Sequence, residues 1–182
     1  MFFEMYKRIQ FWNAADRLGP DILSTYWRIY FKTKMIKLCK SKFKYFDETA
    51  DFRPGAYAIG CSKIYIGKNV VIRPGCMLHA DTRENGAGII IEDGVLMGSG
   101  VHIYVDKHKY ADPDTPILYQ GYHDSREVCV SNGSWIGAKV VILPVVTIGE
   151  NSVVGAGSIV TKTVASGVVV AGNPAKAIKV IR

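Results

Sequence analysis

The chain has 182 residues, of which 48% are apolar, so its length fits one globular domain with a modest appendage and argues against a second large domain. No apolar stretch reaches the roughly 20 residues of a bilayer-spanning helix, and the N-terminus lacks the apolar region of a signal peptide. Four scattered cysteines without a CxxC pair argue against a disulfide framework and a structural zinc site. The sequence therefore predicts a cytoplasmic protein with reduced thiols and no metal.

The net charge of +7 is concentrated at the N-terminus. Residues 1–46 contain ten lysines and arginines against three acidic residues, so this segment carries the whole positive excess and the remainder is neutral. Such a segment suits an anionic membrane surface or a phosphorylated substrate, although solvated lysines around a helical cap give the same count. No nucleic-acid-binding motif accompanies the charge, so we expect no nucleic-acid partner.

Residues 1–54 are expected to form a basic, helical cap. A weak helical pattern covers residues 2–18, Gly19-Pro20 is typical of one helix ending and another beginning, and apolar residues recur at helical spacing from Ile22 to about Cys39. Two roles remain open for this segment. It covers the open end of the following domain with its apolar side chains, or it lies peripherally on the inner membrane face.

From residue 55 onward, a period of six residues replaces the helical spacing. Neither a helix nor simple alternation has this period. Short strands joined by tight corners do, with three strands closing each coil and small residues filling the corners. The clearest aliphatic positions are Val130, Ile136, Ile142, Ile148, Val154 and Val160, and the small or β-branched residues four positions later are Ser134, Val140, Val146, Ser152, Ser158 and Val164.

The same repeat is present earlier in the chain, where two segments interrupt it. Leu78 and Ile91 are 13 positions apart, one more than two hexads, and this shift in register predicts a bulge in residues 79–90. Cys76 is expected to fill a corner before it. Residues 104–127 abandon the repeat, and an irregular loop of that length in a compact domain is usually functional. A C-terminal tail follows at residues 171–182. The earlier aliphatic positions are Ile66, Ile72, Leu78, Ile91, Met97 and Ile103.

Five motifs follow one another in the repeat region: Trp135-Ile136-Gly137-Ala138, Ile148-Gly149-Glu150-Asn151, Gly155-Ala156-Gly157-Ser158, Thr161-Lys162 and Gly172-Asn173-Pro174-Ala175-Lys176. In order and spacing they resemble the hexapeptide-repeat O-acetyltransferases of the maltose, galactoside and nodulation-factor type and their polysaccharide-modifying relatives. The resemblance spans about residues 55–182. It implies an all-β, left-handed parallel β-helix with an N-terminal α-helical segment, assembled as a homotrimer; the left hand comes from the resemblance alone.

The resemblance also implies that acetyl-CoA is the co-substrate, bound in a groove between neighbouring subunits. Lysine suits the phosphates of coenzyme A, and exposed backbone groups suit the amides of its pantetheine arm. For each lysine taken alone, a solvated surface charge is the alternative. The implied contacts are Ala138 and Ala156 for the pantetheine arm, Thr161 and Lys162 for coenzyme A, and Lys176 and Lys179 for its phosphates.

His108 stands where the family has its catalytic base. It belongs to the stretch His102-Ile103-Tyr104-Val105-Asp106-Lys107-His108-Lys109-Tyr110, at the break of the repeat. Transfer from a thioester to a hydroxyl needs a group that accepts the hydroxyl proton as the oxygen attacks the carbonyl, and a neutral imidazole has a suitable pKa. We therefore predict that His108 is the base of the reaction.

Three further residues are predicted to contact the substrates. Asp81 in the bulge is a candidate for holding the acceptor hydroxyl or orienting the imidazole, with Asp106 a weaker candidate for the same task. His102 is expected to face the acceptor. Trp135 is expected to pack near the acyl end of coenzyme A, although a tryptophan at a subunit interface would give the same sequence pattern. The other histidines, His79 and His123, are expected to be structural or to face the substrate.

The chain departs from the family at one corner, where Val145 follows Pro144 in place of the usual glycine. Because glycine tolerates a positive φ, we expect this corner to be rearranged or strained. The acceptor implied by the resemblance is a hydroxyl of a sugar, in a surface polysaccharide or its precursor. The alternatives are another acceptor, such as an antibiotic, serine or an amino sugar, and a β-helix scaffold without activity.

Overall fold

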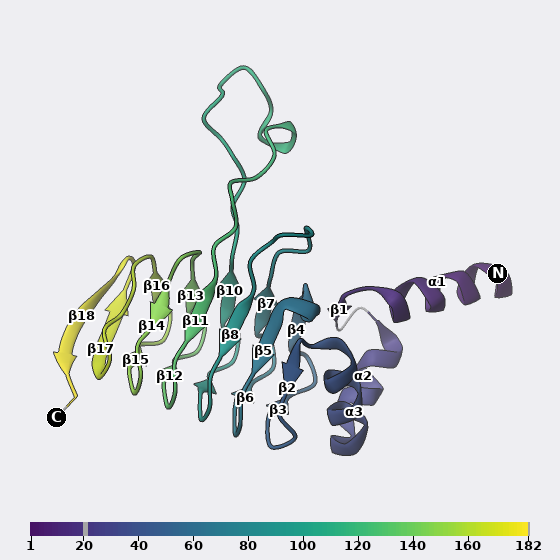
Figure 1. Ribbon diagram of the computed structural model, residues 1–182, viewed down its shortest axis with the longest axis horizontal. Coiled ribbons are helices and arrows are strands. Elements are labelled where there is room, and N and C mark those ends of the chain that lie inside the picture. Colours follow the sequence, from purple (N-terminus) through teal and green to yellow (C-terminus); the bar gives the residue numbers. More distant parts are fainter. Residues whose placement is uncertain (20–21, 182) are drawn as a thin grey trace.

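A computed structural model describes residues 1–19 and 22–181, so part of the expected Gly19-Pro20 helix boundary lies outside the described residues. Three helices, with one two-residue strand between the first and the second, precede the short strands that wind into a parallel β-helix (Figure 1). The helices lie at one end of the coil and the C-terminal hairpin lies at the other. The helices are α1 (Phe2–Ala14), α2 (Leu23–Tyr30) and α3 (Lys32–Lys42).

The strands form three sheets, and each sheet takes one strand from each successive coil. Pairing is parallel except at β1 and in the hairpin of β17 and β18. Sheet 1 contains β1 (Arg17–Leu18), β4 (Tyr57–Ile59), β7 (Met77–His79), β10 (His102–Tyr104), β13 (Val141–Ile142) and β16 (Ile159–Val160). Sheet 2 contains β2 (Tyr45–Phe46), β5 (Ile64–Ile66), β8 (Ile89–Ile91), β11 (Val128–Val130) and β14 (Thr147–Ile148). Sheet 3 contains β3 (Asp51–Phe52), β6 (Val71–Ile72), β9 (Leu96–Met97), β12 (Trp135–Ile136), β15 (Val153–Val154), β17 (Val168–Gly172) and β18 (Ala175–Val180).

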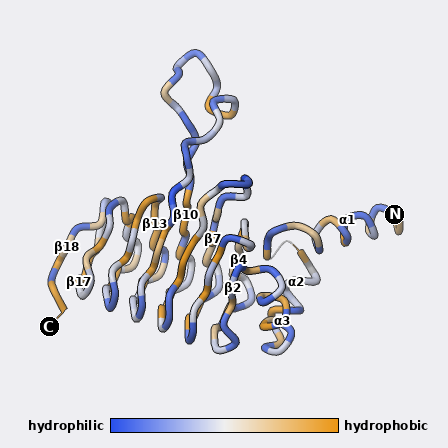
Figure 2. The backbone as a smooth tube through the Cα atoms, viewed as in Figure 1, coloured by the Kyte–Doolittle hydropathy of each residue, from blue (hydrophilic) through white to orange (hydrophobic). Residues whose placement is uncertain are grey.

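The six-residue period places one aliphatic side chain of each strand inside the coil. In sheet 2, Ile66, Ile91, Val130 and Ile148 pair in one register and are fully buried. All the aliphatic and corner positions predicted from the repeat are buried, and Cys76 is among them, so the prediction of the repeat is confirmed. Apolar residues recur along the strands, whereas the projecting loop is mostly polar (Figure 2).

Three buried serines fill corners without leaving a polar group unpaired. Ser134 Oγ donates to the carbonyl of Gly149 at 2.9 Å, and Ser158 Oγ donates to the carbonyl of Gly155 at 2.6 Å. Ser152 makes the equivalent bond to a backbone carbonyl. Because a buried hydroxyl without a partner is costly, these bonds explain why a polar residue is tolerated inside the coil.

The residue just before nearly every corner position has a positive φ. Glycine occupies most of these places, as at Gly75 (φ 78°) and Gly157 (φ 71°), and asparagine occupies others. Val145 is the β-branched exception, with a φ of 77°. The left-handed region is strongly disfavoured for such a side chain. The corner thus keeps the geometry of its neighbours, and the expected consequence of the missing glycine is strain rather than rearrangement.

We expect Val145→Gly to raise the free energy of unfolding by about 1 kcal/mol, because the steric cost of the left-handed conformation exceeds the added chain entropy of glycine. Urea denaturation followed by circular dichroism measures this change. Gly157→Val is the matched control: a Cβ at Gly157 has no neighbour within 4 Å, so only the backbone term changes, and stability should fall. An unaltered unfolding midpoint for Val145→Gly would contradict the prediction.

Helices α2 and α3 pack on the open end of the coil. Ile29, Met35 and Leu38 are buried in one cluster with the interior of the β-helix, and Phe43 stacks on Phe46 with ring centroids 5.8 Å apart. The single helix expected from residue 22 to about 39 is instead two helices, which is a correction to the prediction. The reason is the extended backbone of Phe31, with φ −97° and ψ 118°.

The other N-terminal elements also begin or end at residues different from those expected from the sequence. The helix expected at residues 2–18 ends at Ala14, and the chain then pairs with β4 through β1. The coil starts earlier than the expected boundary at residue 55, because β2 and β3 already pair with the next coil. None of the residues of α1 is buried, in contrast to α3. Within the described parts of the chain, no helix has both the length and the apolar character needed to cross a membrane.

Candidate functional site

Both interruptions of the repeat leave the coil at the corner between sheet 1 and sheet 2. The bulge joins β7 to β8 and the long loop joins β10 to β11, and these strands are neighbours within their sheets. Strand pairing continues across both interruptions, with Ile64 opposite Ile89 and Ile89 opposite Val128. The two irregular segments therefore lie side by side, and the longer one projects away from the coil (Figure 1).

The base of the long loop is a narrow two-stranded stalk. The amide of Arg126 donates to the carbonyl of Val105 at 2.8 Å, and the amide of Lys109 donates to the carbonyl of Gly121 at 2.9 Å. Between these bonds His108 lies opposite Tyr122, and the two rings are in tilted contact, with centroids 4.1 Å apart and an interplanar angle of 34°. The side chain of His108 is exposed. The predicted base is thus accessible but held on a hydrogen-bonded stalk.

Arg83 joins the bulge to this stalk. Its Nε and Nη2 donate to the carboxylate of Asp81 at 2.6–2.9 Å, and its Nη2 lies 3.5 Å from Oδ2 of Asp106. Hydrogen bonds from Arg83 hold the pKa of the buried Asp81 carboxyl well below its usual range. Both acidic candidates from the sequence are therefore paired with one guanidinium, and their contact with an acceptor stays a prediction.

A cleft of about 520 Å³ lies between the base of the loop and the two following corners. It brings Thr161, a predicted coenzyme A contact, to the side of the coil from which the His108 stalk rises. The neighbouring Lys162 is exposed. The cleft is lined by Asp106, Lys107, His123, Asp124 and Arg126 of the loop and by Leu143, Pro144, Val145 and Thr161 of the coil.

The predicted pantetheine contacts lie at the opposite edge of sheet 1, where sheet 3 turns into it. Ala138 and Ala156 are exposed at successive corners, and the amide of Gly157 donates to the carbonyl of Ala138 at 2.8 Å. A Cβ at Gly137 would lie 2.5 Å from the backbone nitrogen of Ala156, so only glycine permits this approach. The corners consequently form a column of closely stacked backbone that is open to a ligand.

The C-terminal hairpin continues this column. Lys176 on β18 lies opposite Ala171 on β17, and a Cβ at Gly155 would lie 2.7 Å from the Cβ of Ala171. Lys176 therefore lies two strands beyond β15, near the same edge as Ala156, and its contact with the phosphates stays a prediction. Lys179 is exposed further along β18, opposite Val169.

The remaining predicted residues lie on the outer faces of the coil. His102 is half-buried on sheet 1, with Nδ1 3.2 Å from the hydroxyl of Tyr104, and the ring of His79 packs edge-on against Tyr104 at 5.8 Å. Trp135 on sheet 3 is 53% exposed, three residues before Ala138. The structure thus groups Ala138, Ala156 and Lys176 at one edge of sheet 1 and His108 and Thr161 at the other.

Sequence reasoning did not find Arg83, Tyr122 or Tyr104. All three lie in or beside the interruptions, where no period assigns a direction to a side chain. The only signal for Arg83 was its position two residues after Asp81. No three His, Cys, Asp or Glu side chains in residues 1–19 and 22–181 are grouped so that they could hold a metal ion.

Comparisons with known proteins agree with this architecture. Residues 130–162 match the family of bacterial transferase hexapeptide repeats (six repeats). The galactoside O-acetyltransferase of Escherichia coli K12 is 36% identical over 152 residues, which cover 81% of this chain and 69% of that protein. The similarity includes the coil, and the left-handed parallel β-helix expected from the motifs is confirmed.

Two solved structures extend the comparison to bound ligands. A galactoside acetyltransferase in complex with coenzyme A is 35% identical, with a TM-score of 0.73 over 82% of this chain and 71% of that chain. A hexapeptide-repeat-containing acetyltransferase from Vibrio cholerae, complexed with acetyl coenzyme A, is 25% identical, with a TM-score of 0.75 over 86% of this chain and 83% of that chain.

Proposed function

Because the chain belongs to the hexapeptide-repeat acetyltransferase family, we propose that it transfers the acetyl group of acetyl-CoA to a hydroxyl of a sugar. The observation that carries the proposal is the exposed imidazole of His108 on a fixed stalk beside the corner of Thr161. The acceptor class is supported by the galactoside O-acetyltransferase relative. A surface polysaccharide or its precursor is the acceptor that best fits the polysaccharide-modifying resemblance.

The transfer proceeds directly from the thioester to the acceptor. His108 accepts the hydroxyl proton as the acceptor oxygen attacks the thioester carbonyl, and a tetrahedral intermediate forms. Its collapse breaks the carbon–sulfur bond, and the imidazolium returns the proton to the leaving thiolate. The products are the acetyl ester and coenzyme A, and the reaction requires no metal.

A homotrimer accounts for the separation of the two groups of site residues. Ala138 and Ala156 lie at one edge of sheet 1, and His108 rises from the other edge. A coenzyme A molecule bound in the backbone column of one subunit therefore receives the histidine of a neighbour when three coils stand side by side. The projecting loop reaches away from its own coil, which is the geometry that such sharing needs (Figure 1).

The acceptor is tested by measuring thiol release from acetyl-CoA with purified protein. We expect release with a galactoside, maltose or a soluble surface polysaccharide, matched by ester formation in mass spectra. Serine, an aminoglycoside antibiotic and glucosamine serve as comparison acceptors. If thiol were released only with one of those three compounds, that compound would be the acceptor in place of a sugar. Absence of coenzyme A binding in calorimetry would instead favour an inactive scaffold.

The N-terminal helix is the part of the chain proposed to contact the inner membrane face. Every residue of α1 is at least partly exposed, and Phe2, Phe3 and Phe11 are exposed by 78%, 68% and 65%. Exposed aromatic residues of this density beside a net positive charge suit the boundary of an anionic bilayer. Such peripheral contact brings the site close to a lipid-linked glycan precursor in the cytoplasm.

A further inference from the structure

We propose that Arg83 is a positioning residue for acetyl transfer, which fixes the stalk of the long loop and thereby the orientation of the His108 imidazole. The inference rests on the proposed function of His108. It concerns a residue of the other interruption, which has no contact of its own with the imidazole. Its basis is a set of contacts that converge on one guanidinium.

The first half of the argument is the anchoring of Arg83 to the coil. Asp81 is the second residue after β7, its side chain is only 3% exposed, and both its oxygens accept from the guanidinium. Its own amide is bonded to the carbonyl of Ala87, and the amide of Arg83 donates to its Oδ1 at 2.9 Å. A Cβ at Gly86 would lie 2.3 Å from the Asp81 carboxyl carbon, so the bulge closes tightly over this carboxylate. The guanidinium is therefore held in one place.

The second half is the contact of the same guanidinium with both arms of the stalk. Nη2 lies 3.5 Å from Oδ2 of Asp106 on the outgoing arm, and it donates to the carbonyl of His123 at 3.4 Å on the returning arm. The guanidinium carbon lies 5.1 Å from the ring centroid of Tyr122. The planar, multiply donating group of arginine can serve all these partners at once, whereas a lysine ammonium cannot.

Tyr122 connects Arg83 to His108, the predicted base. One face of its ring lies against His108 with centroids 4.1 Å apart, and its backbone bridges that of His108. The imidazole itself is exposed, so nothing in the coil buries it in a fixed rotamer. Its direction hence depends on the stacked tyrosine, whose position depends on Arg83. Misplacement of a catalytic group by about 1 Å is enough to cost about 10²-fold in rate.

The test compares Arg83→Gln with Arg53→Gln in the full-length protein. Arg53 is the control because its side chain is as exposed as that of Arg83 and also pairs with an aspartate two residues earlier, Asp51, at 2.7 Å, although Asp51 is exposed and Asp81 is buried. We expect Arg83→Gln to lower kcat by about 10- to 100-fold with little change in the KM for acetyl-CoA. Arg53→Gln should leave both values near those of the native protein. Arg83→Lys should recover part of kcat, since lysine restores the positive charge but not the planar set of N–H donors.

An NMR measurement separates this inference from the proposed role of His108. The stacked tyrosine should displace the His108 ring-proton signals through its ring current, and the signals are assigned by comparison with His108→Ala. In Arg83→Gln this displacement should collapse. Full activity of His108→Ala would overturn the base assignment, whereas the ring shift reports on Arg83 independently.

Three outcomes would overturn the inference. They are a native ring shift with native kcat, a lowered kcat with a native ring shift, and a collapsed ring shift with native kcat. Because Arg83→Gln leaves the buried Asp81 charge unpaired, it has a risk of unfolding. The double variant Asp81→Asn/Arg83→Gln removes both charges and gives the ring-shift readout if the single variant is unstable.

Discussion

Replacement of His108 by alanine is expected to lower kcat for acetyl transfer by about 10²- to 10⁴-fold, the usual contribution of a general base. Within the described residues the exposed imidazole contacts the ring of Tyr122, so its loss should leave the fold and the binding of acetyl-CoA intact. Steady-state thiol release measures kcat, and calorimetry with coenzyme A measures binding. We expect the dissociation constant to stay close to that of the native protein.

Lys109→Ala is the control for this experiment. Lys109 is the next residue on the stalk, its side chain is exposed, and its backbone bond to Gly121 does not depend on the side chain. The variant should therefore keep native kcat. If His108→Ala retained native kcat, the base would have to be sought elsewhere, and the other histidine at the stalk, His123, lines the adjoining cleft.

The second large effect concerns the N-terminal helix. Phe3→Ser/Phe11→Ser is expected to reduce binding to phosphatidylglycerol-rich vesicles by about tenfold or more, because burial of a phenylalanine side chain contributes roughly 1.5–3 kcal/mol. Co-sedimentation at low salt measures the bound fraction. Binding of the native protein should weaken as salt is added, since screening reduces the attraction between the basic segment and anionic lipids.

A matched substitution at the other end of the molecule controls for general loss of apolar surface. Ile178 and Val180 on β18 are 63% and 66% exposed, and these fractions are similar to those of Phe3 and Phe11. Ile178→Ser/Val180→Ser should bind vesicles as the native protein does. Equal binding by Phe3→Ser/Phe11→Ser and the native protein would contradict the membrane role. A change in oligomeric state instead would assign α1 to contact between copies of the chain.

The coil was predictable because its period is a direct consequence of its geometry. Each strand contributes one inward side chain and each corner one small residue, so Ile136 and Ser134 were located without a structure. The positions of Ala138 and Ala156 at one edge follow from the same count. The break between α2 and α3 was not predictable, because helical spacing of apolar residues continues through Phe31 while its backbone is extended.

The inner arrangement of the interruptions was beyond sequence reasoning for a different reason. His108 was predicted as the base from its match to the family's histidine at the break of the repeat, but its partner Tyr122 is brought opposite by loop pairing that no period encodes. Nor does the spacing of Asp81 and Arg83 reveal that one carboxylate is buried and that the guanidinium reaches Asp106. Such contacts depend on side-chain conformations in irregular backbone.

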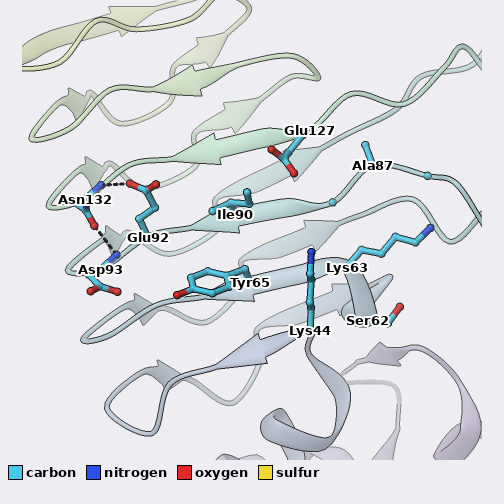
Figure 3. Close-up of a pocket in the computed structure, with 12 residues that line it drawn as sticks. Lys44, Ser62, Lys63, Tyr65, Ala87, Ile90, Glu92, Asp93, Glu127 and Asn132 are labelled. Atoms are coloured by element: carbon cyan, nitrogen blue, oxygen red, sulfur yellow. Dashed lines mark hydrogen bonds between the residues drawn. The ribbon is translucent and has the colours of Figure 1, made fainter.

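The outer face of sheet 2 is an exposed surface outside the candidate site. Sheet 2 carries a groove of about 760 Å³ that is lined by Tyr65 and Ile90 and by the charged side chains of Lys44 and Glu127, among others (Figure 3). Tyr65 stacks on Tyr45 of the neighbouring strand at 4.6 Å. Since outward side chains of a parallel sheet stand in rows across the coils, one substitution in each strand can change a whole face without altering the interior.

The intact pairing on both sides of the two interruptions has a consequence for how such proteins diversify. Ile66 and Ile91 are partners although 25 positions separate them, whereas Val130 and Ile148 are 18 positions apart. Residues inserted at a corner are thus absorbed without a shift in register, so loop length can vary while the backbone column at the far edge is conserved. An insertion or deletion at this corner can therefore change the surface beside His108 while the pairing of the coils stays intact.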